Sequence, residues 1–187
     1  MELLRTPRLL LRHWEESDLP AFFDLYSRDD VMRWLGAHPR RTVASLDGAR
    51  ERLARWRARE PEAPLGLWAV VPLAPGTPSQ PPAGTVLLMP LADADGPTGL
   101  IEVGWHLHPQ HQGQGYATEA ADALLTAAAG AGIGQVLALT DLDNVRSQAV
   151  ADRLGMSDEG TTDRWFRLTA RQFRKTLTAA DGRGRRG

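Results

Sequence analysis

A short stretch in the second half of the chain brings glycines and amide side chains to the start of a helix. Residues 110–115 read Gln-His-Gln-Gly-Gln-Gly, and an alanine-rich segment follows them. Gly113 and Gly115 let the backbone approach a ligand closely and turn its amide N–H groups outward. The partial positive charge of a helix N-terminus adds to these amides, so the loop is suited to a pyrophosphate. The alternative is an ordinary strand-to-helix turn. A P-loop is excluded, since no Gly-Lys-Ser/Thr follows.

One carboxylate precedes this loop on an apolar segment, residues 100–107. Glu102 is a candidate for acid–base chemistry; alternatively, it faces solvent or pairs with an arginine. His106 would share the strand face of Glu102 if simple alternation held. A bulge expected at Gly104 leaves that arrangement open.

Two polar residues beyond the loop are three positions apart. Asn144 and Ser147 would lie on the same face of a helix, where both could reach a ligand. Helix capping by Asn144 and a solvated Ser147 are the alternatives.

Metal and thiol chemistry find little support in the sequence. The chain has no cysteine, which excludes disulfides, thiolate-bound zinc and a catalytic thiol. The five histidines show no metal-ligand spacing, so we expect no metal. His108 and His111 are interpreted as loop residues, and His38 is a weak candidate for a base.

The elements that must position these residues alternate between strands and helices. Asp18 is interpreted as the cap of an early helix that tolerates Pro20 in its first turn, and Thr42 as the cap of a longer one. Gly155 would end the last helix. We predict strands over 8–12, 65–73, 84–91, 100–107 and 135–140, two short strands within 157–160 and 164–168, and helices over 18–26, 42–60, 113–131 and 144–154, with a helical turn at 29–35.

Composition limits the class of protein. With 187 residues, 42% hydrophobic residues and a formal net charge of −1, the chain should form one domain with a single core. We place that domain at 1–172 and a basic, disordered tail at 173–187. The Pro-rich stretch 75–82 is interpreted as a variable hairpin connection. We expect a cytoplasmic protein that binds neither membrane nor nucleic acid.

Five stretches together resemble the GNAT superfamily of acetyl-CoA-dependent N-acetyltransferases. Gln110-x-x-Gly113-x-Gly115 is similar to its Arg/Gln-x-x-Gly-x-Gly/Ala motif. The others resemble the RimJ/RimL-like branch of ribosomal-protein N-terminal acetyltransferases, and they cover 6–12 with Asp18, 101–107, 115–120 and 140–156. The resemblance extends over roughly residues 3–170.

This resemblance implies an α+β fold. It would have a mixed, mostly antiparallel sheet of six to seven strands with about four helices on both faces. The sheet would splay between its fourth and fifth strands, 100–107 and 135–140. The pantetheine arm of acetyl-CoA would lie in that gap, and the loop amides would hold the pyrophosphate.

The resemblance also implies roles for individual residues. Glu102 would take the amine's proton through water, and Ser147 would protonate the departing thiolate, since Ala151 stands where many relatives have a tyrosine. A backbone N–H near His106 or Leu107 would polarise the acetyl carbonyl. The implied cofactor-binding set is Trp105, His106, Leu107, Gln110, Gln112, Gly113, Gln114, Gly115, Tyr116, Ala117, Asn144 and Ser147.

The predicted activity is direct transfer of acetyl from acetyl-CoA to a primary amine through a ternary complex. The acceptor would be a protein N-terminal α-amine or a small molecule. A catalytically silent module that binds coenzyme A or acetyl-CoA is the alternative. Open sheet edges and six tryptophans are compatible with a homodimer.

Overall fold

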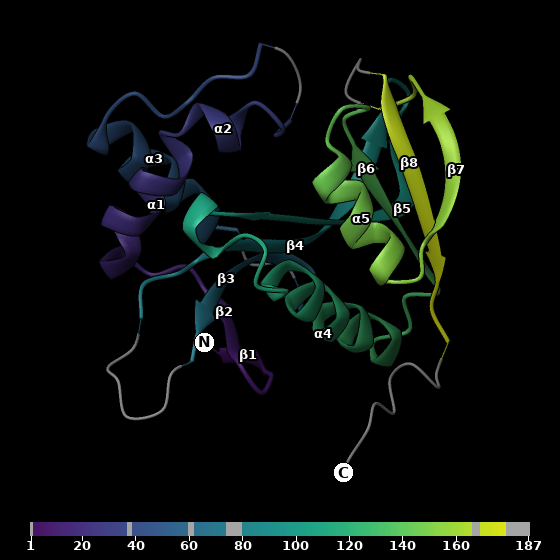
Figure 1. Cartoon of the computed structure of the whole chain (residues 1–187), viewed down its shortest axis with the longest axis horizontal. Coiled ribbons are helices and arrows are strands. Elements are labelled where there is room, and N and C mark those ends of the chain that lie inside the picture. Colours follow the sequence, from purple (N-terminus) through teal and green to yellow (C-terminus); the bar gives the residue numbers. More distant parts are fainter. Residues whose placement is uncertain (1, 37–38, 60–61, 74–79, 166–168, 179–187) are drawn as a thin grey trace.

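The chain folds around an eight-stranded sheet with helices on both faces (Figure 1). The computed structural model describes residues 2–36, 39–59, 62–73, 80–165 and 169–178. Strand order is β1-β2-β3-β4-β5-β6-β8-β7, and only β5 and β6 run parallel. The strands are β1 (Glu2–Arg5), β2 (Leu9–His13), β3 (Gly66–Pro72), β4 (Gly84–Asp93), β5 (Gly96–Leu107), β6 (Gln135–Thr140), β7 (Ser157–Thr162) and β8 (Ala170–Thr176), and the α-helices are α1 (Leu19–Tyr26), α2 (Asp29–Met32), α3 (Leu46–Arg57), α4 (Tyr116–Gly130) and α5 (Val145–Arg153).

The α+β class and the mixed, mostly antiparallel sheet are confirmed. The sheet has eight strands where six to seven were predicted, because residues 2–5 form an additional strand that pairs with β2 in a hairpin. Strand β6 occupies the predicted range, and Gly155 ends α5 with a left-handed φ of +68°.

One predicted helix start is wrong. Helix α3 is capped by Ser45, whose hydroxyl accepts a hydrogen bond from the Gly48 N–H at 3.1 Å, and not by Thr42. Residues 166–168 of the strand predicted within 164–168 lie outside the described residues. The last described strand is β8, at Ala170–Thr176, which extends past residue 172 and buries Phe173 in the main core. Residues 179–187 of the expected tail, and 75–79 of the Pro-rich stretch, lie outside the described residues.

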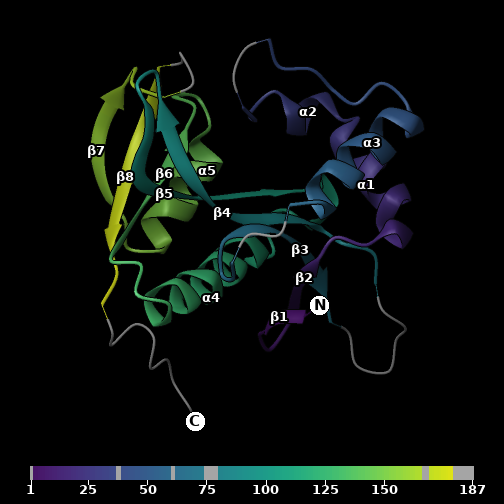
Figure 2. The same ribbon diagram turned by 180° about the vertical axis from the view of Figure 1, so that it is seen from behind.

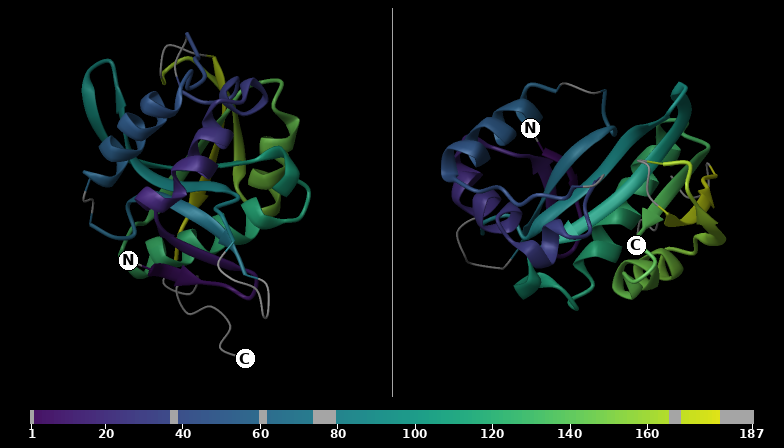
Figure 3. Two further views of the ribbon diagram at one scale, coloured as in Figure 1. Left: turned by 90° about the vertical axis from the view of Figure 1, so that its left-hand side faces the viewer. Right: turned by 90° about the horizontal axis from the view of Figure 1, so that it is seen from above.

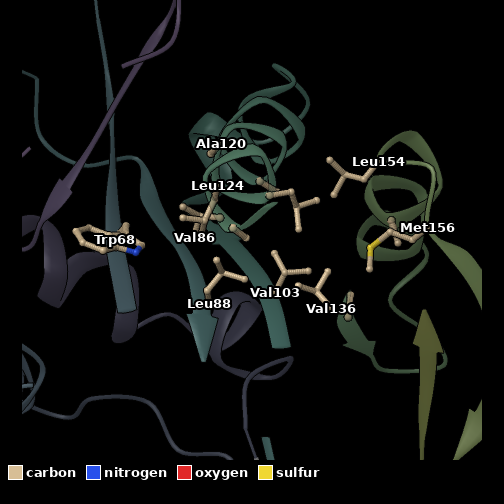
Figure 4. Packing of buried hydrophobic residues seen from close by; sticks show 14 of the residues in the cluster. Trp68, Val86, Leu88, Val103, Ala120, Leu124, Val136, Leu154 and Met156 are labelled. Atoms are coloured by element: carbon tan, nitrogen blue, oxygen red, sulfur yellow. The ribbon is translucent and has the colours of Figure 1, made fainter. Parts of the chain in front are cut away.

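Helices cover both faces of the sheet, as Figures 2 and 3 show from other sides. Alternate side chains of β3 divide between two cores. Trp68 and Val70 belong to the core under α4, whereas Ala69 and Val71 belong to the core under α1 and α3. Figure 4 shows the first core, in which Leu124 of α4 packs with side chains from the sheet and from α5. In the part of the chain that the structure describes, no helix combines the length and apolar character needed to cross a membrane.

Strands β5 and β6 are neighbours over a very short distance. Their parallel ladder contains the single pair Glu102↔Leu137, after which the two strands diverge. Beyond this pair, β5 loses its neighbour on the β6 side, so backbone groups on that edge are left for another partner. The expected splay between 100–107 and 135–140 is present.

The expected bulge at Gly104 is absent from the β4–β5 ladder. Pairing continues without a shift from Pro90↔Ile101 to Gly84↔Leu107, and the irregularity lies between Pro90 and Ala92. Gly104 instead makes room for the opposite side chain, since a Cβ there would lie 3.2 Å from Leu87. Alternation therefore holds through this part of β5.

Candidate functional site

A cleft of about 1320 Å³ opens where β5 and β6 separate. Its walls come from α1, α2 and α3, from β5, from the loop before α4, and from α5. Most of the residues predicted for the site border this cleft. They are Glu102, Trp105, His106, Leu107, Gln112, Gly113, Gly115, Tyr116, Ala117, Asn144 and Ser147. Gln110 and Gln114 are not among its lining residues.

The glycine loop has the geometry of an amide cradle. Gly113 and Gly115 adopt left-handed φ values of +76° and +82°, and both are exposed. Gly115 is the residue directly before α4, so the loop amides and the N-terminus of that helix meet at one place. This arrangement favours a negatively charged group at the loop.

The N-terminal hairpin fixes this loop from behind. Arg8 donates to the Gln114 carbonyl at 2.9 Å and, through Nε, to Glu119 at 2.6 Å. Thr6 also donates to Glu119, at 2.6 Å. Glu119 lies in the first turn of α4, so these contacts join the first predicted motif to that helix. Gln114 has this supporting role, and its side chain donates to the Gln110 carbonyl at 3.0 Å.

Glu102 is a half-buried carboxylate beside the point where the strands part. It borders the cleft, yet protein atoms surround most of it, and this desolvation raises its pKa to about 7. None of the ion pairs found among the described residues involves Glu102. A carboxylate with these properties exchanges protons near neutral pH.

His106 shares the face of Glu102 and is held by a buried hydroxyl pair. The Tyr26 hydroxyl lies 2.6 Å from His106 Nε2 and 2.6 Å from Thr85 Oγ1. Desolvation, followed by the charge of Arg52, lowers the His106 pKa to about 3. The ring is therefore neutral at physiological pH and is a much poorer base than Glu102.

Asn144 and Ser147 lie at the start of α5 on the opposite wall. The Asn144 side-chain oxygen accepts from the Ser147 N–H at 3.2 Å, so Asn144 does cap the helix. Both residues are half-buried and border the cleft. Ala151, one turn further, is fully buried in the core and offers no hydroxyl.

The sequence did not single out several residues of the cleft. Tyr26 comes from α1 and Arg52 from α3, on the face of the sheet opposite α4. Arg146 of α5 also borders the cleft, and it donates a hydrogen bond to Gln112 Oε1 at 3.0 Å. Thr140, at the end of β6, buries a hydroxyl without a partner among the described residues. Gln112 also donates to the Leu107 carbonyl at 3.0 Å. The sequence around Arg52 is that of an ordinary charged helix, so no local pattern indicates that Arg52 belongs to a site.

His108 and His111 are not among the residues that border the cleft. His108 is buried with its Nε2 3.1 Å from Asp24 Oδ2, and it accepts from the Gln110 N–H through Nδ1. The pKa of His111 is lowered by desolvation and by the neighbouring His108. His38 falls outside the described residues. Within the described ranges, no cluster of three or more His, Asp or Glu side chains could hold a metal.

Known proteins share this architecture. A family model described as the acetyltransferase (GNAT) domain matches residues 8–157. An acetyltransferase of the GNAT family from Bacillus anthracis has a TM-score of 0.75 and 20% identity, and the match covers 95% of this chain and 99% of that one.

Two further structures were solved with ligands. RimL, a ribosomal L7/L12 α-N-protein acetyltransferase in complex with coenzyme A, has a TM-score of 0.73 and 20% identity, with coverage of 96% and 99%. MccE, a microcin C7 self-immunity acetyltransferase in complex with acetyl-CoA and AMP, has a TM-score of 0.72 and 15% identity, with coverage of 92% and 94%. At these identities, the solved structures establish the shared fold alone.

Proposed function

The chain belongs to the GNAT family of acetyl-CoA-dependent acetyltransferases, and on that premise we propose that it transfers acetyl directly to a primary amine in a ternary complex. One observation carries this proposal: the glycine loop, Glu102 and Ser147 all border the same cleft. The loop would hold the pyrophosphate, and the pantetheine arm would pass between β5 and β6. Arg146, which reaches the loop through Gln112, would add a positive charge to the phosphate end.

In this mechanism Glu102 takes one proton from the ammonium through a water molecule. The freed nitrogen lone pair forms a bond to the acetyl carbonyl carbon, and the C–S bond then breaks. The amine nitrogen then gives its second proton to the Ser147 hydroxyl, directly or through water, while that hydroxyl passes its own proton to the departing sulfur. The products are an N-acetyl amine and the free thiol, with one proton left on Glu102. A backbone N–H of β5 near His106 or Leu107, on the edge without a strand neighbour, would polarise the carbonyl, an effect worth roughly 3 kcal/mol.

The raised pKa of Glu102 favours an α-amine as the acceptor. At pH 7, deprotonation costs roughly 1 kcal/mol for an α-amine with a pKa near 8, and about 4–5 kcal/mol for a lysine amine near 10.4. A base with a pKa of about 7 is closely matched to the first group. Both a protein N-terminus and a small molecule with such an amine would suit the cleft.

The test is a screen of peptides and small amines for thiol release from acetyl-CoA, run beside a calorimetric titration of the cofactor. Amine-dependent thiol release, with mass spectrometry showing one added acetyl group, is the expected result. Tight binding of acetyl-CoA without release by any amine would instead identify a binding module. Absence of acetyl-CoA binding would remove the whole proposal.

A further inference from the structure

Arg52 projects from α3 into the part of the cleft that lies on the α1–α3 face of the sheet. It is half-buried, and its guanidinium carbon lies 4.9 Å from the centre of the Tyr26 ring and 5.6 Å from that of Trp56. Both aromatic residues also border the cleft. This stacking holds the planar guanidinium in place and leaves its N–H edge available.

The guanidinium has no anionic partner among the residues that the structure describes. Its recorded hydrogen bond goes to the thioether of Met32, at 3.9 Å. Other arginines of similar or deeper burial are paired: Arg12 binds both oxygens of Asp18, at 2.6 and 2.9 Å, and Arg40 binds both oxygens of Asp141. Desolvation lowers the pKa of Arg52, which is the expected cost of a buried positive charge without a counterion.

An anion at this position is not explained by the phosphates of acetyl-CoA. The glycine loop leads into α4, which covers the other face of the sheet. Arg52 lies near His106, because Tyr26 contacts both the Arg52 guanidinium and the His106 ring. His106 and Glu102 are four residues apart on β5, or about 13 Å along the strand. A ligand could therefore present an amine near Glu102 and a negative charge near Arg52.

We propose that Arg52 binds an anionic group, a carboxylate or a phosphate, that the acceptor carries several bonds away from its amine. The proposal rests on the acetyl transfer proposed above and specifies its substrate class. Two N–H groups of the guanidinium edge can bind two oxygens of such a group side by side. Arg52 is thus a specificity-determining residue, and Glu102 acts separately at the amine end.

The test compares acceptors that differ only in this charge. One pair is 8-aminooctanoate and its amide; the second is the peptide amide Ser-Ala-Asp-Ala and its Ser-Ala-Asn-Ala counterpart; and 6-aminohexyl phosphate serves as the phosphate probe. Affinities are measured by calorimetry with coenzyme A bound and without it, and kcat and KM are measured by thiol release. The proteins are the wild type, R52Q, R52K and the control R55Q, in which the changed residue is exposed on the same helix and does not border the cleft.

We expect at least one anionic probe to bind tenfold or more tightly than its neutral partner in the wild type and in R55Q. R52Q should lose this preference through KM while neutral amines keep their kcat, and R52K should retain part of it. Equal binding of every pair, no binding of any probe, or a preference that persists in folded R52Q would overturn the proposal. If the charge preference is present but no acceptor releases thiol, acetyl transfer fails while the anion site stands.

Discussion

Glu102 is the residue whose chemistry is most directly open to measurement. In the wild type, kcat/KM should rise as the pH passes through about 7, because Glu102 then loses its proton. Glu102→Gln keeps the size and removes the base, so we expect a fall of about 10²-fold or more at pH 7. The rate should recover only near the amine's own pKa, near 8 for an α-amine. Glu51→Gln, an exposed change on α3, is the control. If the pH profiles of kcat/KM for Glu102→Gln and the wild type overlay, Glu102 has no role as a base.

Glu102→Gln should lower the activity but raise the stability of the folded protein above pH 7. The folded-state pKa of Glu102 is raised from 4.5 to about 7, so the folded protein favours the protonated acid. The stability it contributes is complete below pH 4.5 and is lost as the pH rises through 7. Glu102→Gln should therefore melt at a higher temperature than the wild type at pH 8, and the gap should close below pH 4.5. A gap that does not change with pH would mean that the pKa of Glu102 is not raised by folding.

Ser147 is the hydroxyl donor proposed for the departing sulfur. Ser147→Ala removes that hydroxyl but keeps the backbone N–H that Asn144 caps, so α5 should remain intact. Turnover should fall about 10²-fold, whereas the calorimetric affinity for acetyl-CoA should be unchanged. Unchanged turnover, with chemistry shown to be rate-limiting, would remove Ser147 from the mechanism.

Residue patterns singled out the glycine loop and the Asn144–Ser147 pair, because each depends on spacing within one element, whereas the roles of Glu102 and Ser147 came from the resemblance to the acetyltransferase family. They could not predict the contact between Tyr26 and His106, which are 80 positions apart. Tyr26 reads in the sequence as one more apolar residue of a helix face. Arg52 was missed for a related reason, since a charged residue on a polar helix gives no sign of what it will face.

At the scale of the elements, the glycine loop depends on backbone conformations that other residues rarely adopt. Gly115→Val would put a branched side chain at a φ of +82° and 3.2 Å from the Arg8 guanidinium. We expect acetyl-CoA affinity to fall at least tenfold, or about 1.4 kcal/mol. Gly132→Val is the matched control, because Gly132 has the same φ at the other end of α4 and nothing near its Cβ. Equal affinities in the two folded variants would contradict the pyrophosphate assignment.

Strand β8, which the residue patterns did not predict, shows where element prediction stops. The range 164–168 contains Trp165 and Leu168, whereas β8 carries three charged residues within Ala170–Thr176. Strand β8 tolerates them because it lies beside β7, where Arg171 pairs with Asp158 and Arg174 pairs with Glu159. Cross-strand pairs of this kind depend on which strands become neighbours, and a single sequence does not reveal that.

At the scale of the whole molecule, one ion pair joins the walls of the cleft. Arg40, ahead of α3, binds both carboxylate oxygens of Asp141, directly after β6, and both residues border the cleft. The side chains are only 9% and 21% exposed, so Asp141→Asn leaves Arg40 largely buried and without a counterion. The free energy of unfolding, measured with urea, should fall by about 2 kcal/mol. Asp143→Asn, an exposed neighbour, should change it by less than about 0.5 kcal/mol, and equal effects would show that the pair contributes nothing.

The strand order also has a consequence for the order of events during synthesis. Strand β8 lies between β6 and β7, although it follows both of them in the chain. Neither β7 nor the outer edge of β6 has a partner strand until β8 has emerged from the ribosome. The α4 core also depends on β8 and the residue that follows it, because Phe173 and Leu177 are buried in that core. Pairing of β6, β7 and β8 is therefore a late step of folding, and a chain in which β8 has not yet docked presents strand edges that can aggregate.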